Sequence, residues 1–172
     1  MAAPWSRPTN PMGKVPAIVH HTGGGNRVVT EAAAICHYLA EVQAPELLPR
    51  DEEKADYFRY LFFASGPIEA AVTARSMGWT VDDPQKQGMT GFGSYERATD
   101  AFEKLLTGRD YVCGTRFTMA DVYVGAQVDW GMVFGSLPKR PVFEAYAERV
   151  RQRPAYQAAK AIDNALIAEA RK

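Results

Sequence analysis

The stretch FTMADVYVGAQVDWGMVFG, residues 117–135, constrains the fold of this chain most, because its pattern is that of a helix apolar nearly all round. Thr118 followed three positions later by Asp121 is a variant of the capping box, with Asp where Glu or Gln is usual. Phe117 before the cap and Val122 after it supply the hydrophobic staple. A helix that is apolar on every side is buried, so we expect this one at the centre of a helical bundle. We interpret Thr118 and Asp121 as structural capping residues rather than catalytic ones.

The chain from about Asp51 onward has the pattern of an all-α region. The expected elements are a helix from Asp51 to about Arg75, a loop over 76–93, a helix from Tyr95 that ends at Gly108, and helices over 141–151 and from Pro154 onward. The first helix contains Gly66-Pro67, and a proline inside a helix kinks or breaks it. Its apolar face is predicted to consist of Tyr57, Phe58, Leu61 and Phe62.

The chain before Pro49 has a different pattern, with short strands ahead of one helix. Residues 17–21 and 27–29 are the candidate strands, and the TGGGN segment between them suits a tight hairpin. A helix is expected from about Glu31, with Thr30 as its N-cap and Glu31 at the positive end of its dipole. The apolar face of that helix is predicted to be Ile35, Tyr38, Leu39 and Val42. Pro16 stands where the first strand should begin, and proline is confined to edges, first residues and bulges of sheets.

Composition excludes several classes of function. Twenty basic and twenty acidic residues give a net charge of zero, which argues against nucleic acid or an anionic membrane surface as the main partner. No apolar run is long enough to span a bilayer, and no signal-peptide pattern opens the sequence. Cys36 and Cys113 lie far apart without metal-binding spacing, and we interpret Cys36 as a small core residue. We therefore expect a soluble chain in a reducing, cytoplasmic setting, with no metal site.

Four segments taken together resemble the cytosolic glutathione S-transferase family, and its bacterial members in particular. They are NPMGKVPAI, TEAAAICHYLAE, YVCGTRFTMADVYVGAQVDWGMVFG and VFEAYAERVRQRPAYQAA, in the order and spacing of that family. The resemblance implies a mainly α fold: an all-α C-terminal domain over 51–172, preceded by a β-β-α remnant of a thioredoxin-like domain over 1–43. It also implies glutathione as a substrate.

The resemblance assigns a glutathione site to Val15, Pro16, Glu31 and Ala32. Pro16 matches the family's cis-proline, which aims the backbone of Val15 at glutathione; the alternative is an ordinary trans proline opening an edge strand. Glu31-Ala32 matches the family's Glu-Ser pair, in which the acid holds the ligand's amino group and the helix N-terminus its carboxylate. Ala32 has no hydroxyl, so we expect weaker binding, by roughly 1.5–3 kcal/mol for one hydrogen bond to a charged group. Glu31 alternatively serves only the helix dipole.

The resemblance places the catalytic Ser, Tyr or Cys of the family in a strand-helix-strand unit ahead of the NPMGKVPAI segment. Only nine residues precede Asn10 here, so we expect no catalytic residue in this chain as written. A fragment, a start placed too far downstream, or a diverged protein would each explain this. The family's second-substrate pocket suggests Phe63, Pro67, Trp79 and Trp130, although such residues also form helix cores. Asp129 is expected to lie on a solvated face or to pair with an arginine.

The resemblance implies two alternative functions. The first is conjugation of glutathione to small electrophiles, as in detoxification, by a homodimer in its full-length form, with activity impaired or absent in this chain. The alternative is a non-catalytic module of the same fold that binds ligands or partner proteins.

Overall fold

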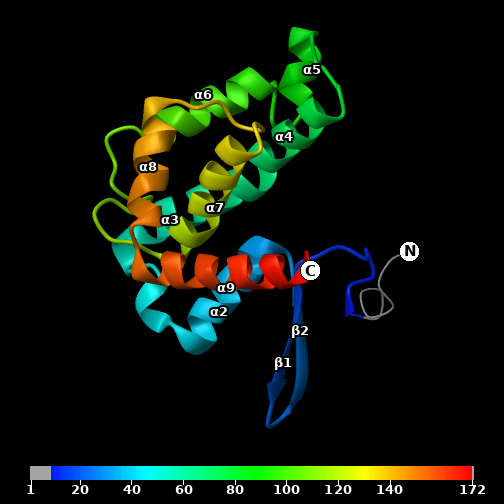
Figure 1. Ribbon diagram of the computed structural model, residues 1–172. Coiled ribbons are helices and arrows are strands. Elements are labelled where there is room, and N and C mark those ends of the chain that lie inside the picture. Colours follow the sequence, from blue (N-terminus) through cyan, green and yellow to red (C-terminus); the bar gives the residue numbers. More distant parts are fainter. Residues whose placement is uncertain (1–8, 172) are drawn as a thin grey trace.

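The computed structural model describes residues 9–171 and consists mainly of helices (Figure 1). Its elements in chain order are β1 (Ala17–Thr22), β2 (Gly25–Thr30), α2 (Ala32–Gln43), 3-10 turns at Pro45–Leu47 and Asp51–Glu53, α3 (Lys54–Phe63), a π turn (Ala64–Ile68), α4 (Glu69–Ser76), α5 (Pro84–Met89), α6 (Tyr95–Leu106), α7 (Met119–Val133), α8 (Pro141–Arg151) and α9 (Pro154–Ala170). The predicted mainly α fold with a β-β-α beginning is confirmed.

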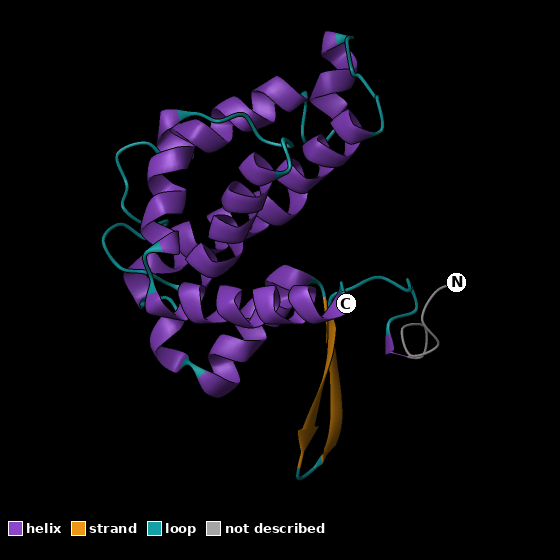
Figure 2. Cartoon of the chain, in the orientation of Figure 1, coloured by secondary structure: helices purple, strands orange, loops and turns teal. Residues whose placement is uncertain are grey.

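The two strands form an antiparallel hairpin that extends away from the helices (Figure 2). Ala17 pairs with Thr30 at its base and Thr22 with Gly25 at its tip, so the turn lies within the predicted glycine-rich segment. Gly25 has a φ of 112°, which glycine adopts without the clash of a Cβ atom. Where the hairpin meets the helices, β2 leads directly into α2.

Helix α7 packs against α2, α3 and α8, as its all-round apolar pattern predicts. Its capping box is present: Asp121 Oδ2 accepts from the Thr118 backbone N–H at 2.8 Å. Gly131 allows the chain after α7 to fold back closely, since a Cβ at this position would lie 2.7 Å from Cγ of Leu137. The core around α7 contains the fully buried side chains of Tyr57, Ile68, Phe102, Val124, Val128, Phe143 and Tyr146.

The predicted break at Gly66-Pro67 is a π turn that joins α3 to α4. The predicted apolar face of α3 was wrong in part: Tyr57 and Leu61 are buried, but Phe58 and Phe62 are 39% and 65% exposed. Tyr60 is buried in their place. Because nearly all residues over 57–63 are apolar, their periodicity fits two overlapping faces equally well, and only the packing against α7 selects one.

Two local predictions were also wrong. Glu31, not Thr30, occupies the N-cap position of α2. The segment expected as a loop contains α5, which Asp83 caps by accepting from the backbone N–H groups of Gln85 and Lys86 at 2.7 and 3.1 Å. Pro84 follows at the first helical position, where its missing N–H has no cost. Along residues 9–171, no helix combines the length and apolar character that a membrane crossing requires.

Candidate functional site

A cavity of about 570 Å³ lies where the β-β-α segment meets the helical bundle. Its walls come from the loop before β1, the first turn of α2, the end of α3 with the π turn, and α4 and α7. The structure brings together in it all four residues of the predicted glutathione site, Val15, Pro16, Glu31 and Ala32. The other lining residues are Asn10, Lys14, Ala33, Ala34, Phe62, Ser65, Glu69 and Tyr123. We call this space the central cavity.

The loop before β1 is held in shape by Asn10, which is 5% exposed. Its side-chain amide donates to the Lys14 carbonyl at 3.0 Å, and its side-chain oxygen accepts from the Met12 N–H at 3.0 Å. The peptide bond from Val15 to Pro16 is cis. Val15 is 71% exposed, and its backbone groups bond to no described residue, so they are available to a ligand that pairs like a strand.

The first turn of α2 forms a second wall of the central cavity. No side chain of the described residues caps this helix, so its first N–H groups, at Ala32 to Ala34, are open to an anion. Glu31 precedes them with a φ of 66° and a ψ of 115°, and it is the only described residue other than glycine with a positive φ. A non-glycine residue held in a sparsely populated region costs about 1–3 kcal/mol, and such residues cluster at ligand sites.

The charges on these two walls suit a zwitterionic ligand with carboxylates at its ends. Lys14 and the α2 N-terminus attract carboxylates, while the Glu31 carboxylate attracts an ammonium group. Sequence reasoning missed Asn10 and Lys14, although both lie in the NPMGKVP segment that directed attention to Val15 and Pro16.

The bundle contributes a polar group to the lining of the central cavity. The Tyr123 hydroxyl donates to Oε2 of Glu69 at 3.3 Å and accepts from Nε2 of Gln127 at 3.2 Å. Burial raises the pKa of Tyr123 to about 12, so the hydroxyl stays protonated at neutral pH. Ser65 also lines the cavity, and its hydroxyl donates to the Phe62 carbonyl at 3.5 Å.

An apolar trough of about 610 Å³ adjoins the central cavity and shares Ser65 and Glu69 with it. The trough runs along α4, and Trp79 and Phe92 line it from the chain on either side of α5. Trp79 is thus the one predicted second-substrate residue that lines a space adjoining the central cavity.

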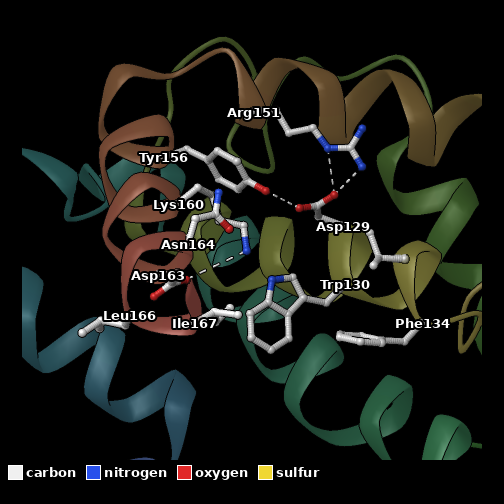
Figure 3. A pocket seen from close by; sticks show the side chains of 11 residues that line it. Asp129, Trp130, Phe134, Arg151, Tyr156, Lys160, Asp163, Asn164, Leu166 and Ile167 are labelled. Carbon is white, nitrogen blue, oxygen red and sulfur yellow. Dashed lines mark hydrogen bonds and ion pairs between the residues drawn. The ribbon is translucent and has the colours of Figure 1, made fainter. Parts of the chain in front are cut away.

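The structure places the other three second-substrate candidates apart. Phe63 lines a groove between α3 and α6, Pro67 lies within the π turn, and Trp130 lines a groove between α7 and α9 (Figure 3). These grooves share no lining residue with the central cavity. The positions of these residues in the sequence do not show which groove each side chain faces, because that depends on how the helices pack.

Asp129 pairs with an arginine, which was one of the two expected environments. Arg151 Nε donates to Oδ1 of Asp129 at 2.8 Å, and the Tyr156 hydroxyl donates to Oδ2 at 2.5 Å (Figure 3). The carboxylate is 3% exposed and ties α7 to α8 and α9. With these partners it serves packing rather than proton transfer.

Neither cysteine is poised as a nucleophile. Burial raises the pKa of Cys36, and it raises the pKa of Cys113 to about 11. Both side chains are partly buried and carry free thiols. Because the thiolate is the reactive form, the raised pKa values disfavour a nucleophilic role for either thiol at neutral pH.

The sequence matches two family models that fit this architecture. Residues 66–154 match the model described as Glutathione S-transferase, C-terminal domain, and residues 1–42 match that described as Glutathione S-transferase, N-terminal domain. The chain belongs to the glutathione S-transferase family. The first match covers most of the helical bundle, and the second ends at the close of α2.

Curated relatives and solved structures agree with this family. Glutathione S-transferase GstA of Escherichia coli O157:H7 is 27% identical over 152 residues, which cover 86% of this chain and 73% of that one. Glutathione S-transferase 1 of Schizosaccharomyces pombe is 33% identical over 122 residues, covering 66% of this chain and 52% of its own length. The chain thus spans about half of the yeast relative.

Two solved structures of family members have the same fold. A sphingomonad glutathione S-transferase complexed with glutathione is 26% identical, with a TM-score of 0.68, over 92% of this chain and 78% of that one. A glutathione transferase of Methylococcus capsulatus is 30% identical, with a TM-score of 0.68, over 92% and 77%.

Proposed function

We propose that this glutathione S-transferase family chain binds glutathione in the central cavity and holds it for transfer of its thiol sulfur to small apolar electrophiles. One observation carries the proposal: the exposed Val15 backbone, the Glu31 carboxylate and the open N-terminus of α2 line the same cavity. The Val15 backbone suits strand-like pairing, the Glu31 carboxylate suits an ammonium group, and the N-terminus of α2 suits a carboxylate. The structure of a relative with bound glutathione supports this ligand.

The electrophile is proposed to occupy the apolar trough along α4. The trough adjoins the central cavity at Ser65 and Glu69, so a ligand there would meet the sulfur of a glutathione bound next to it. Trp79 and Phe92 give it apolar walls that suit small aromatic compounds.

Activation of the thiol is proposed to be weak in the 172-residue chain on its own. A thiolate forms readily when a hydroxyl or a cation stabilises it. Lys14 is the cationic side chain among the described lining residues, and it is assigned above to a ligand carboxylate. The hydroxyls that line the central cavity among residues 9–171 are those of Ser65 and Tyr123, and each already donates to another oxygen. The chain would therefore still position glutathione, but it would lower the pKa of the glutathione thiol less. Detoxification, a cytoplasmic location and a homodimer are further parts of this proposal, taken from the family resemblance.

Calorimetric titration of the 172-residue chain with glutathione tests the binding step. We expect saturable binding that Glu31→Gln weakens, because the ligand's ammonium group loses its charged partner. Glu52→Gln, at an exposed position that does not line the central cavity, is the matched control and should leave binding unchanged. Equal binding by the Glu31→Gln variant and the unchanged chain would contradict the proposed site.

Conjugation is tested with 1-chloro-2,4-dinitrobenzene, by the absorbance of the thioether product. The account expects slow turnover that stays measurably above the uncatalysed rate at saturating glutathione and is reduced by Glu31→Gln. Rapid turnover that Glu31→Gln abolishes would overturn the proposal that thiol activation is weak.

A non-catalytic binding module is the second candidate. The engaged hydroxyls of Ser65 and Tyr123 favour it for the isolated chain. Glutathione binding without conjugation at any concentration of electrophile would support this candidate.

A further inference from the structure

One carboxylate lies where the central cavity adjoins the apolar trough. Glu69 lines both spaces, and it is the only charged residue among the described residues that line the trough. The rest of that lining consists of small residues, hydroxyl residues, one valine and two aromatic rings. A charge beside such a surface is screened less than one surrounded by water, so Glu69 should influence which charge a ligand can carry at this point.

The π turn between α3 and α4 brings Glu69 to this junction. The turn ends at Ile68, and Glu69 is the first residue of α4. Ser65, within the turn, also lines both spaces. An acidic residue in a first turn stabilises the positive end of a helix, but that role alone does not require the side chain to line two cavities.

Two residues of α7 orient the Glu69 carboxylate. The Tyr123 hydroxyl donates to its Oε2 at 3.3 Å, and Nε2 of Gln127 donates to the Tyr123 oxygen at 3.2 Å. No described residue donates a hydrogen bond to Oε1 of Glu69. One carboxylate oxygen is therefore held by the protein while the other is left for a ligand.

No cation in the described part of the chain neutralises Glu69, which forms no ion pair there. Lys14 lines the central cavity but not the trough. Arg75, the one cation of α4, lies over the ring of Tyr95 with Cζ 4.2 Å from its centroid, and it lines a different pocket. The negative charge of Glu69 is therefore available to a ligand.

We propose that Glu69 selects the electrophile by its charge. It favours small aromatic electrophiles that carry an ammonium group or another N–H donor beside the reacting carbon, and it disfavours those with an anionic group there. The ring of the electrophile would lie against Trp79 and Phe92. This inference rests on the proposed function, because it takes the central cavity as the glutathione site and the trough as the electrophile site.

Calorimetry with three glutathione thioethers tests this selection without requiring turnover. The S-(2-aminoethyl), S-(2-hydroxyethyl) and S-(carboxymethyl) derivatives of glutathione are similar in size and differ in the charge that they place close to the sulfur. The aminoethyl thioether should bind about fivefold more tightly than the hydroxyethyl one, and the carboxymethyl thioether about fivefold more weakly, as for an exposed ion pair. Equal affinities of the three thioethers would overturn the proposal.

Substitutions of Glu69 show whether this residue sets the order of affinities. Glu69→Gln keeps the shape and removes the charge, so the difference between the aminoethyl and carboxymethyl thioethers should shrink, and Glu69→Lys should reverse it. The side chain is exposed, so both variants should fold, which circular dichroism checks. Glu52→Gln, with the same charge change at an exposed position outside both spaces, should preserve the order. An order that Glu69→Gln leaves intact would overturn the proposal.

Glutathione itself separates a failure of this inference from a failure of the proposed function. It carries no group beyond the sulfur, so Glu69→Gln should leave its affinity largely unchanged, and rising salt should reduce the preference among the thioethers. Saturable glutathione binding that Glu69→Gln abolishes would show that Glu69 holds glutathione rather than the electrophile, which overturns only this inference. Absence of glutathione binding to the unchanged chain would overturn the proposed function and this inference with it.

Discussion

The Tyr146 hydroxyl donates a hydrogen bond to Oδ1 of Asp121 at 2.7 Å, and neither side chain has any exposed surface. This contact joins α8 to the first turn of α7. The same carboxylate accepts from the backbone N–H groups of Val112 and Thr118, at 2.8 Å each. Asp121 therefore links the capping box of α7 to the loop before it and to the neighbouring helix.

Tyr146→Phe should lower the free energy of unfolding by roughly 1.5–3 kcal/mol, since a buried carboxylate loses one hydrogen bond. Urea unfolding followed by circular dichroism measures this. Tyr111→Phe is the control, because the Tyr111 hydroxyl makes no hydrogen bond within residues 9–171, and its effect should stay within about 0.5 kcal/mol. Equal effects of the two substitutions would contradict the role given to the Asp121 contact.

The environment of Glu53 predicts that the stability of the fold depends on pH in the acid range. Arg116 donates to both of its carboxylate oxygens and also to the carbonyls of Glu46 and Leu48, which fixes the segment between α2 and α3. The arginine lowers the pKa of Glu53 from 4.5 to about 2. A carboxyl group with a lower pKa in the folded state stabilises the fold above its unfolded pKa, so this stability is lost as pH falls from about 4.5 toward 2.

Glu53→Gln should therefore cost roughly 1–3 kcal/mol at neutral pH and much less near pH 2. Unfolding free energies across this pH range measure the difference. A cost that is the same at both ends would show that the charge of Glu53 does not contribute. Glu52→Gln again serves as the exposed control.

The capping box of α7 could be predicted from sequence because it is local, with its two residues three positions apart. The break at Gly66-Pro67 could be predicted for a similar reason, since proline lacks an N–H. For Asp129 the prediction was a solvated face or a pair with an arginine, and the structure shows the pair with Arg151. The strand and helix order followed from turn residues and periodicity.

Other features depend on contacts between distant parts of the chain. The Tyr123 side of the central cavity comes from α7, and no local pattern relates this residue to Glu31. The N-cap of α2 is Glu31 rather than the expected Thr30. Glu31 has a positive φ, a conformation that glycine adopts most readily, so residue preferences do not predict it at a glutamate. The exposure of Phe58 and Phe62 follows from how α3 rotates against α7.

Glu31→Gly should stabilise the fold while it weakens ligand binding. Glycine adopts the φ of 66° without the Cβ clash, so the free energy of unfolding should rise by about 1 kcal/mol. Thermal unfolding and glutathione calorimetry on the same sample measure both effects. A variant that is less stable would show that Glu31 holds its backbone without strain.

Ala32→Ser should tighten glutathione binding. Ala32 is the first residue of α2 and lines the central cavity, so a hydroxyl there would add a hydrogen bond to a bound carboxylate. The gain should be about tenfold in affinity, at the lower end of the value for a bond to a charged group. Ala34→Ser, at another cavity-lining position of the same turn, is the control. Calorimetry of this variant shows whether the gain in affinity depends on where the hydroxyl is placed. An unchanged affinity for Ala32→Ser would place the ligand carboxylate elsewhere.

The most direct test of the central claim is residue-resolved NMR of the backbone amides during titration with glutathione. The account predicts saturable shifts at Val15 and at residues 31–34, which line the central cavity. The indole signal of Trp130, in the groove between α7 and α9, should stay unchanged. Saturable shifts that spare Val15 and residues 31–34, or no shifts at any glutathione concentration, would contradict the account.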